Sequence, residues 1–250
     1  MPRVRGVFVT GTDTGVGKTL VAAALAAWVR QQGRAVGVMK PVATGGRRRW
    51  DRRGERLVSE DAARLARASG ATDPWALINP VCFAEPVAPW AAAQQARRPI
   101  RLSPLARAFD ALAARHETVI VEGVGGLLVP LNASVTVADL AKRLGLPLIL
   151  VARPGLGTLN HTLLSVAAAR ARRLPLRAIV LNHAQPPARH ARAERIVRSN
   201  AATLRRLAGV PVLGPLPHLP AAGAASPSRL ARWLTAACGD HAVDTIVSLW

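Results

Sequence analysis

Short apolar runs alternate along this chain with longer stretches in which apolar residues recur at helical spacing. The short runs are rich in Val, Ile and Leu and are mostly apolar on both faces, which is typical of parallel strands covered by helices. Strands are expected at residues 7–10, 35–39, 118–121, 146–152, 177–181 and 210–213. Helices are expected at residues 18–32, 60–68, 102–116, 137–144, 160–173 and 189–207. The alternation predicts an α/β fold with a doubly wound, mostly parallel sheet flanked by helices, and it places ligands at the carboxyl ends of the strands.

The length and composition favour one domain that spans residues 1–250. Half of the 250 residues are hydrophobic, so the chain can bury a large core. The final stretch, residues 238–250, has no assigned place in that domain. The N-terminal sequence has no pattern of a signal or transit peptide, and no run reaches the roughly 18 apolar residues of a membrane span. Two widely separated cysteines give weak support for a disulfide, so a cytoplasmic protein without a membrane partner is expected.

A formal net charge of +20 raises the question of a nucleic-acid partner. The positive residues are almost all arginine and are scattered along every expected helix, which indicates a biased composition rather than a binding footprint. The exception is RRRWDRR at residues 47–53, where a tryptophan among basic residues could stack on a base. We interpret this segment as part of a long, solvated and basic loop over residues 46–60. Specific nucleic-acid binding is not expected.

Lysine is scarce in this arginine-rich chain, and its few positions are therefore informative. Only Lys18, Lys40 and Lys142 are lysine. A retained lysine can mark a place where a compact ammonium is needed and a planar guanidinium does not fit. Two of the three lie in glycine-containing loops, whereas Lys142 belongs to an expected helix and is interpreted as a surface residue. The lysine positions thus direct attention to the loops that follow the first two strands.

Residues 10–19, TGTDTGVGKT, resemble a phosphate-binding loop that is one residue too long. The usual motif has four residues between its first glycine and Gly-Lys-Ser/Thr. Counted back from Gly17, that first glycine would stand at position 12, but this position is Thr12 and the glycine is Gly11, one residue earlier. The loop nevertheless follows an expected strand and leads into an expected helix, as phosphate binding requires. In such a loop the backbone N–H groups face an anion, Lys18 reaches the outer phosphates and the Thr19 hydroxyl holds Mg²⁺.

Three further segments at the same end of the sheet carry polar residues. Lys40 follows the second strand, with Thr44 four residues later in a glycine-rich turn. Lys40 could serve as a second cation of the site. Because a proline and two glycines lie close to it in the sequence, a plain surface position is the alternative. Glu122 ends a buried strand, where a carboxylate is costly unless it is paired or bound to metal, so it is a candidate Mg²⁺ ligand. Asp61 lies in the first turn of a helix, where it is a metal ligand or a simple helix-start residue.

Six segments of the chain, taken together, carry a family resemblance. TGTDTGVGKT, MKPVATG, NPVCFAEPVAP, VEGVGGLLVPL, GTLNHTLL and LNHAQPP follow one another in the order and spacing found in dethiobiotin synthetases. The similarity runs from about residue 4 to about residue 220, and the lengthened loop is itself a feature of that family. The resemblance implies that the glycine-rich end of the loop holds ATP, while its earlier part, around Thr14, faces the organic substrate.

The resemblance further implies an enzyme of biotin biosynthesis with a P-loop NTPase-like fold. The enzymes resembled convert 7,8-diaminononanoate, CO₂ and ATP into dethiobiotin, ADP and phosphate. One amine captures CO₂ as a carbamate, the carbamate attacks the γ-phosphate, and the second amine closes the ureido ring and expels phosphate. This cyclo-ligase chemistry uses no protein nucleophile, so catalysis consists of positioning the reactants and neutralising negative charge. Members of the family are homodimers with the substrate near the subunit interface, which would involve the turn at residues 157–160.

The resemblance also implies roles for individual residues. Lys18 would hold the phosphates, and Lys40 would stabilise the carbamate and its phosphorylated successor. Thr14 and Thr44 would bind the organic substrate. The implied ligands of the Mg²⁺ cofactor are Thr19, Asp61 and Glu122, whose hard oxygen donors suit this ion. The implied nucleotide-binding residues are Gly15, Val16, Gly17, Lys18, Thr19, Leu20, Asp61, Glu122, Gly123, Val124, Gly125, Asn182, His183, Pro217, His218 and Leu219.

Two features depart from the family pattern. AAGAAS, at residues 221–226, stands where several relatives have an acidic residue, so a contact to the ribose is missing or is supplied by other groups. The chain has no tyrosine, so a tyrosine contact to the substrate carboxylate in some members has no counterpart, and an arginine within residues 189–198 is one substitute. Both departures bear on substrate affinity more than on reaction type.

Two alternative functions share part of this pattern. Molecular-switch ATPases that partition DNA or deliver metals have a loosely similar lengthened loop, and a strongly positive charge would suit a DNA-bound one. Those proteins usually carry a second lysine within the loop, where this chain has Thr12, Asp13 and Thr14. Amide-forming ligases related to cobyrinic acid amidation carry an added glutamine-hydrolysing domain, for which this chain is too short. Neither Cys82 nor Cys238 lies in the setting of the catalytic cysteine of such a domain.

Overall fold

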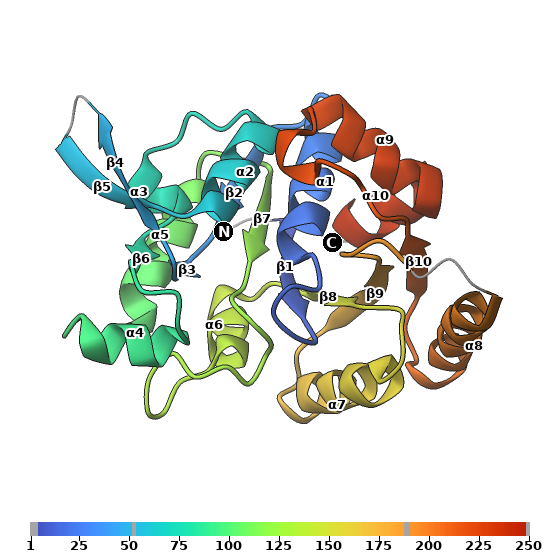
Figure 1. Cartoon of the computed structure of the whole chain (residues 1–250). Coiled ribbons are helices and arrows are strands. Elements are labelled where there is room, and N and C mark those ends of the chain that lie inside the picture. Colours follow the sequence, from blue (N-terminus) through green and yellow to red (C-terminus); the bar gives the residue numbers. More distant parts are fainter. Residues whose placement is uncertain (1–4, 52–53, 188–190, 249–250) are drawn as a thin grey trace.

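The computed structural model describes residues 5–51, 54–187 and 191–248. Its centre is a six-stranded sheet in the order β10-β9-β8-β1-β7-β2, in which every pairing is parallel. The strands are β1 (Arg5–Gly11), β2 (Val36–Met39), β7 (Thr118–Glu122), β8 (Leu148–Ala152), β9 (Leu176–Asn182) and β10 (Val212–Leu216). Helices cover both faces of the sheet (Figure 1). The predicted doubly wound α/β fold is therefore confirmed.

The apolar side chains of the strands alternate between two helical layers. In β1, Val7 and Val9 face one layer and Phe8 faces the other, so both sides of the strand are buried. This two-sided burial is why the strand sequences are nearly continuous apolar runs. The first layer consists of α1 (Lys18–Gln31), α2 (Glu60–Ser69), α9 (Pro227–Cys238) and α10 (Asp240–Ser248). The second consists of α5 (Leu102–Ala113), α6 (Val137–Leu144), α7 (Thr158–Ala171) and α8 (Ala191–Leu207).

The predicted strands and helices of the central layers all have counterparts, with bounds that differ by a few residues. Parts of three expectations, at residues 52–53, 189–190 and 249–250, lie outside the described residues. None of the described helices combines the length and the apolar character that a membrane crossing would need. The sequence did not predict α9 or α10, nor several short elements, which are β3 (Val42–Ala43), β6 (Val81–Cys82), α3 (Trp75–Ile78), α4 (Pro89–Gln95) and the 3₁₀ helix η1 (Ala222–Ala224).

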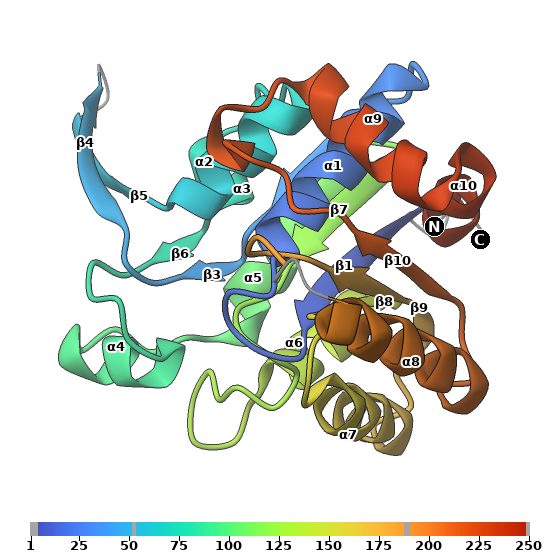
Figure 2. The same cartoon turned by 45° about the vertical axis from the view of Figure 1, so that its right-hand side comes forward.

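The segment expected to be a solvated loop at residues 46–60 is instead largely a β-hairpin. β4 (Arg47–Asp51) pairs antiparallel with β5 (Gly54–Val58), and the hairpin projects from the body of the molecule (Figure 2). Arg48 Nη1 lies 2.7 Å from Glu55 Oε1 across the two strands. A diagonal pair of opposite charges on neighbouring strands is compatible with this register.

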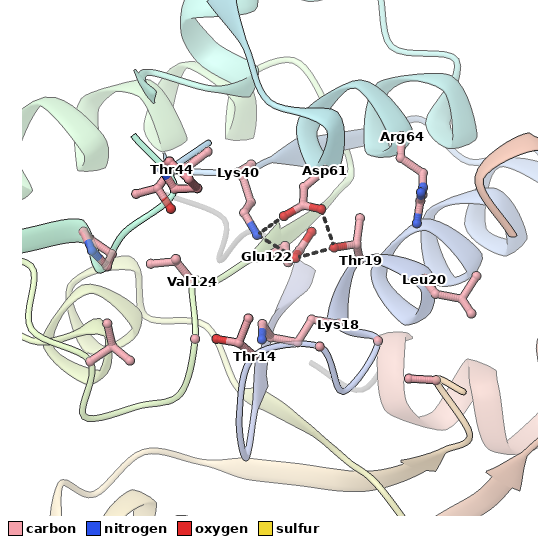
Figure 3. A pocket seen from close by; sticks show the side chains of 18 of the residues that line it. Thr14, Lys18, Thr19, Leu20, Lys40, Thr44, Asp61, Arg64, Glu122 and Val124 are labelled. Carbon is pink, nitrogen blue, oxygen red and sulfur yellow. Dashed lines mark hydrogen bonds and ion pairs between the residues drawn. The ribbon is translucent and has the colours of Figure 1, made fainter. Parts of the chain in front are cut away.

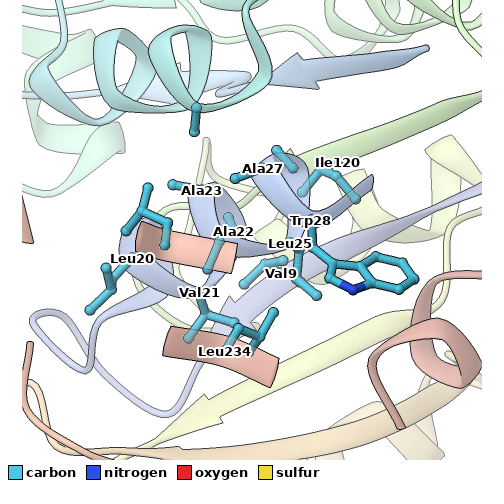
Figure 4. Packing of buried hydrophobic residues seen from close by; sticks show 14 of the residues in the cluster. Val9, Leu20, Val21, Ala22, Ala23, Leu25, Ala27, Trp28, Ile120 and Leu234 are labelled. Atoms are coloured by element: carbon cyan, nitrogen blue, oxygen red, sulfur yellow. The ribbon is translucent and has the colours of Figure 1, made fainter. Parts of the chain in front are cut away.

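The C-terminal stretch without an assigned place forms α10 and packs against the core. Val243, Ile246 and Val247 of α10 are buried in the layer that contains α1 and α9. The indole of Trp28 on α1 donates a hydrogen bond from Nε1 to Asp240 Oδ1 at 2.8 Å. Figure 4 shows the apolar side chains of α1, including Trp28, packed against the sheet and α9. The C-terminal helices therefore help to hold the helix that begins at the phosphate-binding loop.

The strand order brings the predicted site residues to one edge of the sheet. β1 lies between β8 and β7, so the direction of winding reverses beside it, and ligands of such sheets bind at this point. The carboxyl ends of β1, β2 and β7 lead to the phosphate-binding loop, to Lys40 and to Glu122. The first turn of α2 adds Asp61 to the same edge.

Candidate active site

The loop at residues 12–17 joins β1 to α1 and presents its backbone to a cavity. Gly15 and Gly17 adopt left-handed conformations, with φ of 74° and 94°, which most other residues adopt only with strain. Within the described chain, no side chain caps α1 at Gly17, and the first turn of the helix contains no acidic residue. The first N–H groups and the positive end of the helix dipole are therefore available to an anion.

Asn182, the last residue of β9, fixes this loop from the other side. Its Nδ2 donates a hydrogen bond to the carbonyl oxygen of Val16 at 2.9 Å. A side chain at Gly17 would collide with the Asn182 amide, so only glycine fits there. The Oδ1 atom of Asn182 is buried and has no hydrogen-bond partner among the described residues. This oxygen therefore retains its capacity to accept a hydrogen bond.

Lys18 is the first residue of α1 and is 7% exposed. Its Nζ donates a hydrogen bond to the carbonyl oxygen of Asp13 at 2.8 Å. Burial and, next, the positive charge of Lys40 lower the pKa of Lys18 to about 8. A bound anion would offset both effects, so the geometry and the pKa of Lys18 both suit a phosphate contact.

Lys40 follows β2 and lies at the centre of a buried charge cluster. Its Nζ is 2.6 Å from Glu122 Oε1 and 2.9 Å from Asp61 Oδ2. The same nitrogen donates to the carbonyl oxygen of Gly123 at 3.1 Å. Oγ1 of Thr19 lies 2.9 Å from Asp61 Oδ1 and 2.8 Å from Glu122 Oε1 (Figure 3). Because Lys40 is only 2% exposed, it is not the plain surface residue that the sequence left open.

Burial and mutual charge together set the protonation of this cluster. Burial raises the pKa of Glu122 above its ordinary value, against the opposing charge of Lys40. Burial also disfavours the Lys40 ammonium, but the charges of Glu122 and Asp61 outweigh that effect and raise its pKa. The same ammonium lowers the pKa of Asp61 despite the burial of that carboxyl. The negative charges of Glu122 and Asp61 also act on Lys18, whose pKa they raise against the effect of burial, so two carboxylates and two ammonium groups share this cluster.

Thr19, Asp61 and Glu122 fit the ligand set of Mg²⁺. Together they supply a hydroxyl and two carboxylates, which are the hard oxygen donors that this ion prefers. The Oε2 atom of Glu122 is buried without a hydrogen-bond partner among the described residues, which is costly for a carboxylate that lacks a cation. In residues 5–51, 54–187 and 191–248, no group of three or more His, Cys, Asp or Glu side chains could hold a metal ion. A hydroxyl with two carboxylates suits Mg²⁺, because this ion takes its other ligands from phosphates and water.

The charge cluster opens into a cavity of about 640 Å³ that gathers most of the predicted site residues. The predicted residues that line it are Thr14, Gly15, Gly17, Lys18, Thr19, Leu20, Lys40, Thr44, Asp61, Glu122, Val124 and Gly125. The other lining residues are Ala43, Arg64, Pro86, Val87, Ala88, Pro89, Val129, Ala184 and Ala222. A second cavity of about 450 Å³ shares Thr14, Gly125 and Val129 with the first. The site thus has a charged end at the loop and a second compartment beyond Thr14.

Curated relatives of the chain carry the name ATP-dependent dethiobiotin synthetase BioD. The protein of Anaeromyxobacter dehalogenans (strain 2CP-C) is 48% identical over 219 residues, which cover 87% of this chain and 92% of the relative. That of Aromatoleum aromaticum is 42% identical over 231 residues, which cover 92% and 97%. That of Bacillus cereus (strain B4264) is 40% identical over 215 residues, which cover 85% and 83%. This chain belongs to the dethiobiotin synthetase family.

The fold of this dethiobiotin synthetase family member is shared with more distant ATPases. The AAA domain family model matches residues 5–226. The septum site-determining protein MinD from Pyrococcus horikoshii OT3, complexed with Mg-ADP, is 17% identical with a TM-score of 0.55, covering 98% of this chain and 94% of that one. The Pyrococcus furiosus cell division ATPase MinD is 18% identical with a TM-score of 0.55, covering 97% and 96%. At these identities the likeness shows only the fold, and it confirms the P-loop NTPase-like architecture.

Seven residues that the family resemblance placed at the nucleotide do not line the main cavity. Val16 and Gly123 contribute carbonyl oxygens, which accept hydrogen bonds from Asn182 and Lys40. The side chain of Leu219 is buried in the core cluster that contains α1. The seven residues are Val16, Gly123, Asn182, His183, Pro217, His218 and Leu219. Their contact with the nucleotide stays a prediction.

Several lining residues were not singled out from the sequence. Pro86–Pro89 lie within NPVCFAEPVAP, one of the segments that carry the dethiobiotin synthetase resemblance, so a signal for them was present. Ala184 lies in the LNHAQPP segment, two residues after Asn182, and Ala222 lies in the AAGAAS departure. Arg64 gives no signal at all, because one arginine among many on a helix is uninformative.

Proposed function

We propose that this family member is an ATP- and Mg²⁺-dependent cyclo-ligase that converts 7,8-diaminononanoate, CO₂ and ATP into dethiobiotin, ADP and phosphate. The observation that carries the proposal is the buried Lys40, held 2.6 Å from Glu122 beside a phosphate-binding loop. The alternative of a DNA-partitioning or metal-delivering switch ATPase is not favoured. The curated relatives are synthetases, and the second lysine follows β2 instead of lying within the loop.

The reaction requires anionic reactants to meet. The nitrogen of one substrate amine bonds to CO₂, and its proton is released as the carbamate forms. A carbamate oxygen then bonds to the γ-phosphorus while the bond to ADP breaks. The second amine bonds to the carbonyl carbon and releases a proton, the bond from carbon to the phosphoryl oxygen breaks, and phosphate leaves with the electron pair of that bond as the ureido ring closes. Positively charged groups at the site lower the repulsion between carbamate and triphosphate.

Lys18 and the start of α1 would bind the outer phosphates of ATP. This assignment is supported by the position of Lys18 at the positive end of the helix and by its lowered pKa of about 8. Lys40 would stabilise the carbamate and its phosphorylated successor. Its three N–H groups have acceptors on Glu122, Asp61 and Gly123, so one of these must be exchanged for a substrate oxygen.

Thr19, Asp61 and Glu122 would hold Mg²⁺. The unpaired Oε2 of Glu122 and the hard oxygen donors of the three side chains support this assignment. When bound, Mg²⁺ supplies charge neutralisation on the triphosphate. The two carboxylates would then be shared between the ion and Lys40, so that the cluster positions both cations with one set of oxygen atoms.

The second cavity would hold the aliphatic part of the organic substrate. Thr14 lines both cavities, and Thr44 lines the main one, so both hydroxyls are placed to bind the reacting end of the diamine. Leu128 and Leu164 line the second cavity and are 57% and 61% exposed. A second copy of the chain would cover these side chains, and we propose a homodimer at this face, near the turn at residues 157–160.

The direct test is phosphate release in the presence of ATP, Mg²⁺ and bicarbonate, with and without 7,8-diaminononanoate. The proposal predicts phosphate only when the diamine is present, in the same amount as dethiobiotin measured by mass spectrometry. ATP turnover that needs no diamine and is stimulated by DNA would favour the switch ATPase and overturn the proposal.

The domain organisation and the cellular location of the protein are also proposals. A single ATP-binding domain over residues 1–250 is supported by the position of all three apolar clusters on the one central sheet. A cytoplasmic location is supported by the two cysteines, Cys82 and Cys238, which are both free thiols.

A further inference from the structure

We propose that Arg64 binds the inner, α-phosphate of the nucleotide and thereby sets nucleotide affinity. The inference rests on the proposed use of ATP. It adds to the nucleotide site a residue to which no sequence motif of the chain gives a role. Arg64 lies on α2, three residues after Asp61. Residues at this spacing lie on the same face of a helix, so one face of α2 supplies both the candidate metal ligand and a guanidinium to the cavity.

The hydrogen-bonding capacity of Arg64 is largely unused. Its Nε is buried and has no hydrogen-bond partner among the described residues. Its Nη2 lies 3.6 Å from Glu60 Oε1, but the Glu60 side chain is 77% exposed, whereas that of Arg64 is 22% exposed. A pair with so exposed a carboxylate contributes little. A guanidinium held in a cavity wall with a buried free donor is suited to a ligand oxygen.

The position of Arg64 along the cavity selects the part of the nucleotide that it meets. Lys18, Lys40 and the two carboxylates occupy one side of Thr19, while Arg64 reaches down on the other side toward Leu20 (Figure 3). In phosphate-binding loops the lysine reaches the β- and γ-phosphates, and the backbone of the loop and first helical turn holds the inner phosphates. The Leu20 side is therefore the inner-phosphate side, and Arg64 lies there.

The segment beside the guanidinium supplies no carboxylate to it. A Cβ atom at Gly223 would lie 3.3 Å from Arg64 Nη2, so the guanidinium lies against the backbone at that position. The stretch AAGAAS around Gly223 contains no acidic residue. Arginine binds phosphate oxygens through two parallel N–H donors, and Nε with one Nη provides such a pair in Arg64. The α-phosphate is the anion that the proposed substrate brings to this side.

Arg67 provides a matched control one turn further along α2. It is exposed and does not line the cavity, but it carries the same charge, and its Nη2 donates to the carbonyl oxygen of Gly223 at 3.3 Å. Arg67→Ala therefore removes an arginine from the same helix and the same neighbouring segment without removing a donor from the cavity. Arg64→Met keeps the length and packing of the side chain and removes the donors, and Arg64→Lys keeps one charged donor group.

The experiment measures the binding of ADP and of a non-hydrolysable ATP analogue, with Mg²⁺, by titration calorimetry, together with the KM for ATP and kcat. Arg64→Met is expected to weaken both nucleotides by about the same factor, roughly tenfold for the loss of a charge-assisted contact. Arg64→Lys is expected to recover part of the affinity, and Arg67→Ala to bind as the wild type does. The KM for ATP should rise with little change in kcat.

Two results would overturn the inference while leaving the proposed function intact. The first is unchanged nucleotide binding in Arg64→Met. The second is a loss confined to the ATP analogue, which would place the guanidinium at the γ-phosphate. If the wild-type protein binds neither nucleotide, the proposed function itself fails, and the role of Arg64 fails with it.

Discussion

At the scale of single residues, the site is built around charges that would be costly to bury alone. Lys40 and Glu122 are 2% and 0% exposed, and their charged atoms lie 2.6 Å apart. Replacing a buried pair by apolar residues of similar volume is often neutral or stabilising, whereas removal of one partner typically costs about 3–5 kcal/mol. The pair is therefore weak support for a purely structural role, and its position beside the phosphate-binding loop supports the chemical role that we propose.

The change Lys40→Gln tests this chemical role. The variant keeps the phosphate-binding loop and Lys18, so we expect ATP affinity to stay within a few fold of the wild type. We expect kcat to fall by about 100-fold or more, as for the loss of a group that stabilises developing charge. Calorimetric titration with nucleotide and steady-state phosphate release measure the two effects.

Lys142→Gln is the control, because Lys142 is an exposed lysine on α6. Circular dichroism of Lys40→Gln should show a folded protein at the assay temperature. A loss of nucleotide affinity equal to the loss of rate would mean that Lys40 holds ATP instead of the carbamate.

The lowered pKa of Lys18 predicts that nucleotide binding takes up a proton. In the free protein this lysine has a pKa of about 8, and phosphate oxygens that contact the ammonium would raise it. Uptake should therefore be small near pH 7, about half a proton near pH 8 and close to one proton near pH 9. Titrations in buffers of different ionisation enthalpy measure the number directly. Binding without proton uptake at the highest of these pH values would contradict the prediction that a lysine of lowered pKa gains its proton when a phosphate binds.

At the scale of elements, the apolar pattern predicted the strands of the central sheet but missed α9, whose Leu230 and Leu234 are buried in the core, as well as elements at the periphery. The strands of the central sheet are buried on both faces, so their runs of Val, Ile and Leu are clear in the sequence. The hairpin of β4 and β5 lies away from the core and β5 is largely exposed, so it leaves little apolar pattern in the sequence. α10 was missed because its helical spacing places only Val243, Ile246 and Val247 in the core.

The candidate site was predictable to the extent that backbone geometry demands particular residues. Gly17 is required beside the Asn182 amide, and Lys40 stands out because lysine is rare in this chain. Arg64 was not predictable, because its role depends on a buried, unpaired donor that only the packing of α2 reveals. The contacts of Pro217, His218 and Leu219 with the nucleotide stay predictions.

The contribution of α10 to stability can be measured with Ile246→Ala. Ile246 is 3% exposed and packs in the cluster that contains α1, so we expect unfolding free energy to fall by about 2–5 kcal/mol. Leu207→Ala, at an exposed position at the end of α8, should cost less than about 0.5 kcal/mol. Urea unfolding with an unchanged m-value is the measurement. Equal effects of the two changes would show that α10 is not part of the core.

At the scale of the whole molecule, the net charge of +20 is spread over the chain and is not specific to the site. We expect duplex DNA to bind weakly and without sequence preference, with an affinity that falls steeply between about 50 and 200 mM salt. Fluorescence anisotropy with two duplexes of unrelated sequence checks this. A clear preference for one duplex that persists at the higher salt would point to a nucleic-acid function, in which the exposed Trp50 of β4 would be the first residue to examine.

The central claim is that the positive groups of the site bring a carbamate oxygen to the γ-phosphorus. One measurement follows that oxygen: a single turnover with ¹⁸O-labelled CO₂ in unlabelled water, stopped before the label exchanges, with the mass of the released phosphate determined. Because the attacking oxygen remains on phosphorus when the ring closes, the account predicts one ¹⁸O atom in each phosphate. Phosphate that carries no label, formed together with dethiobiotin, would contradict it.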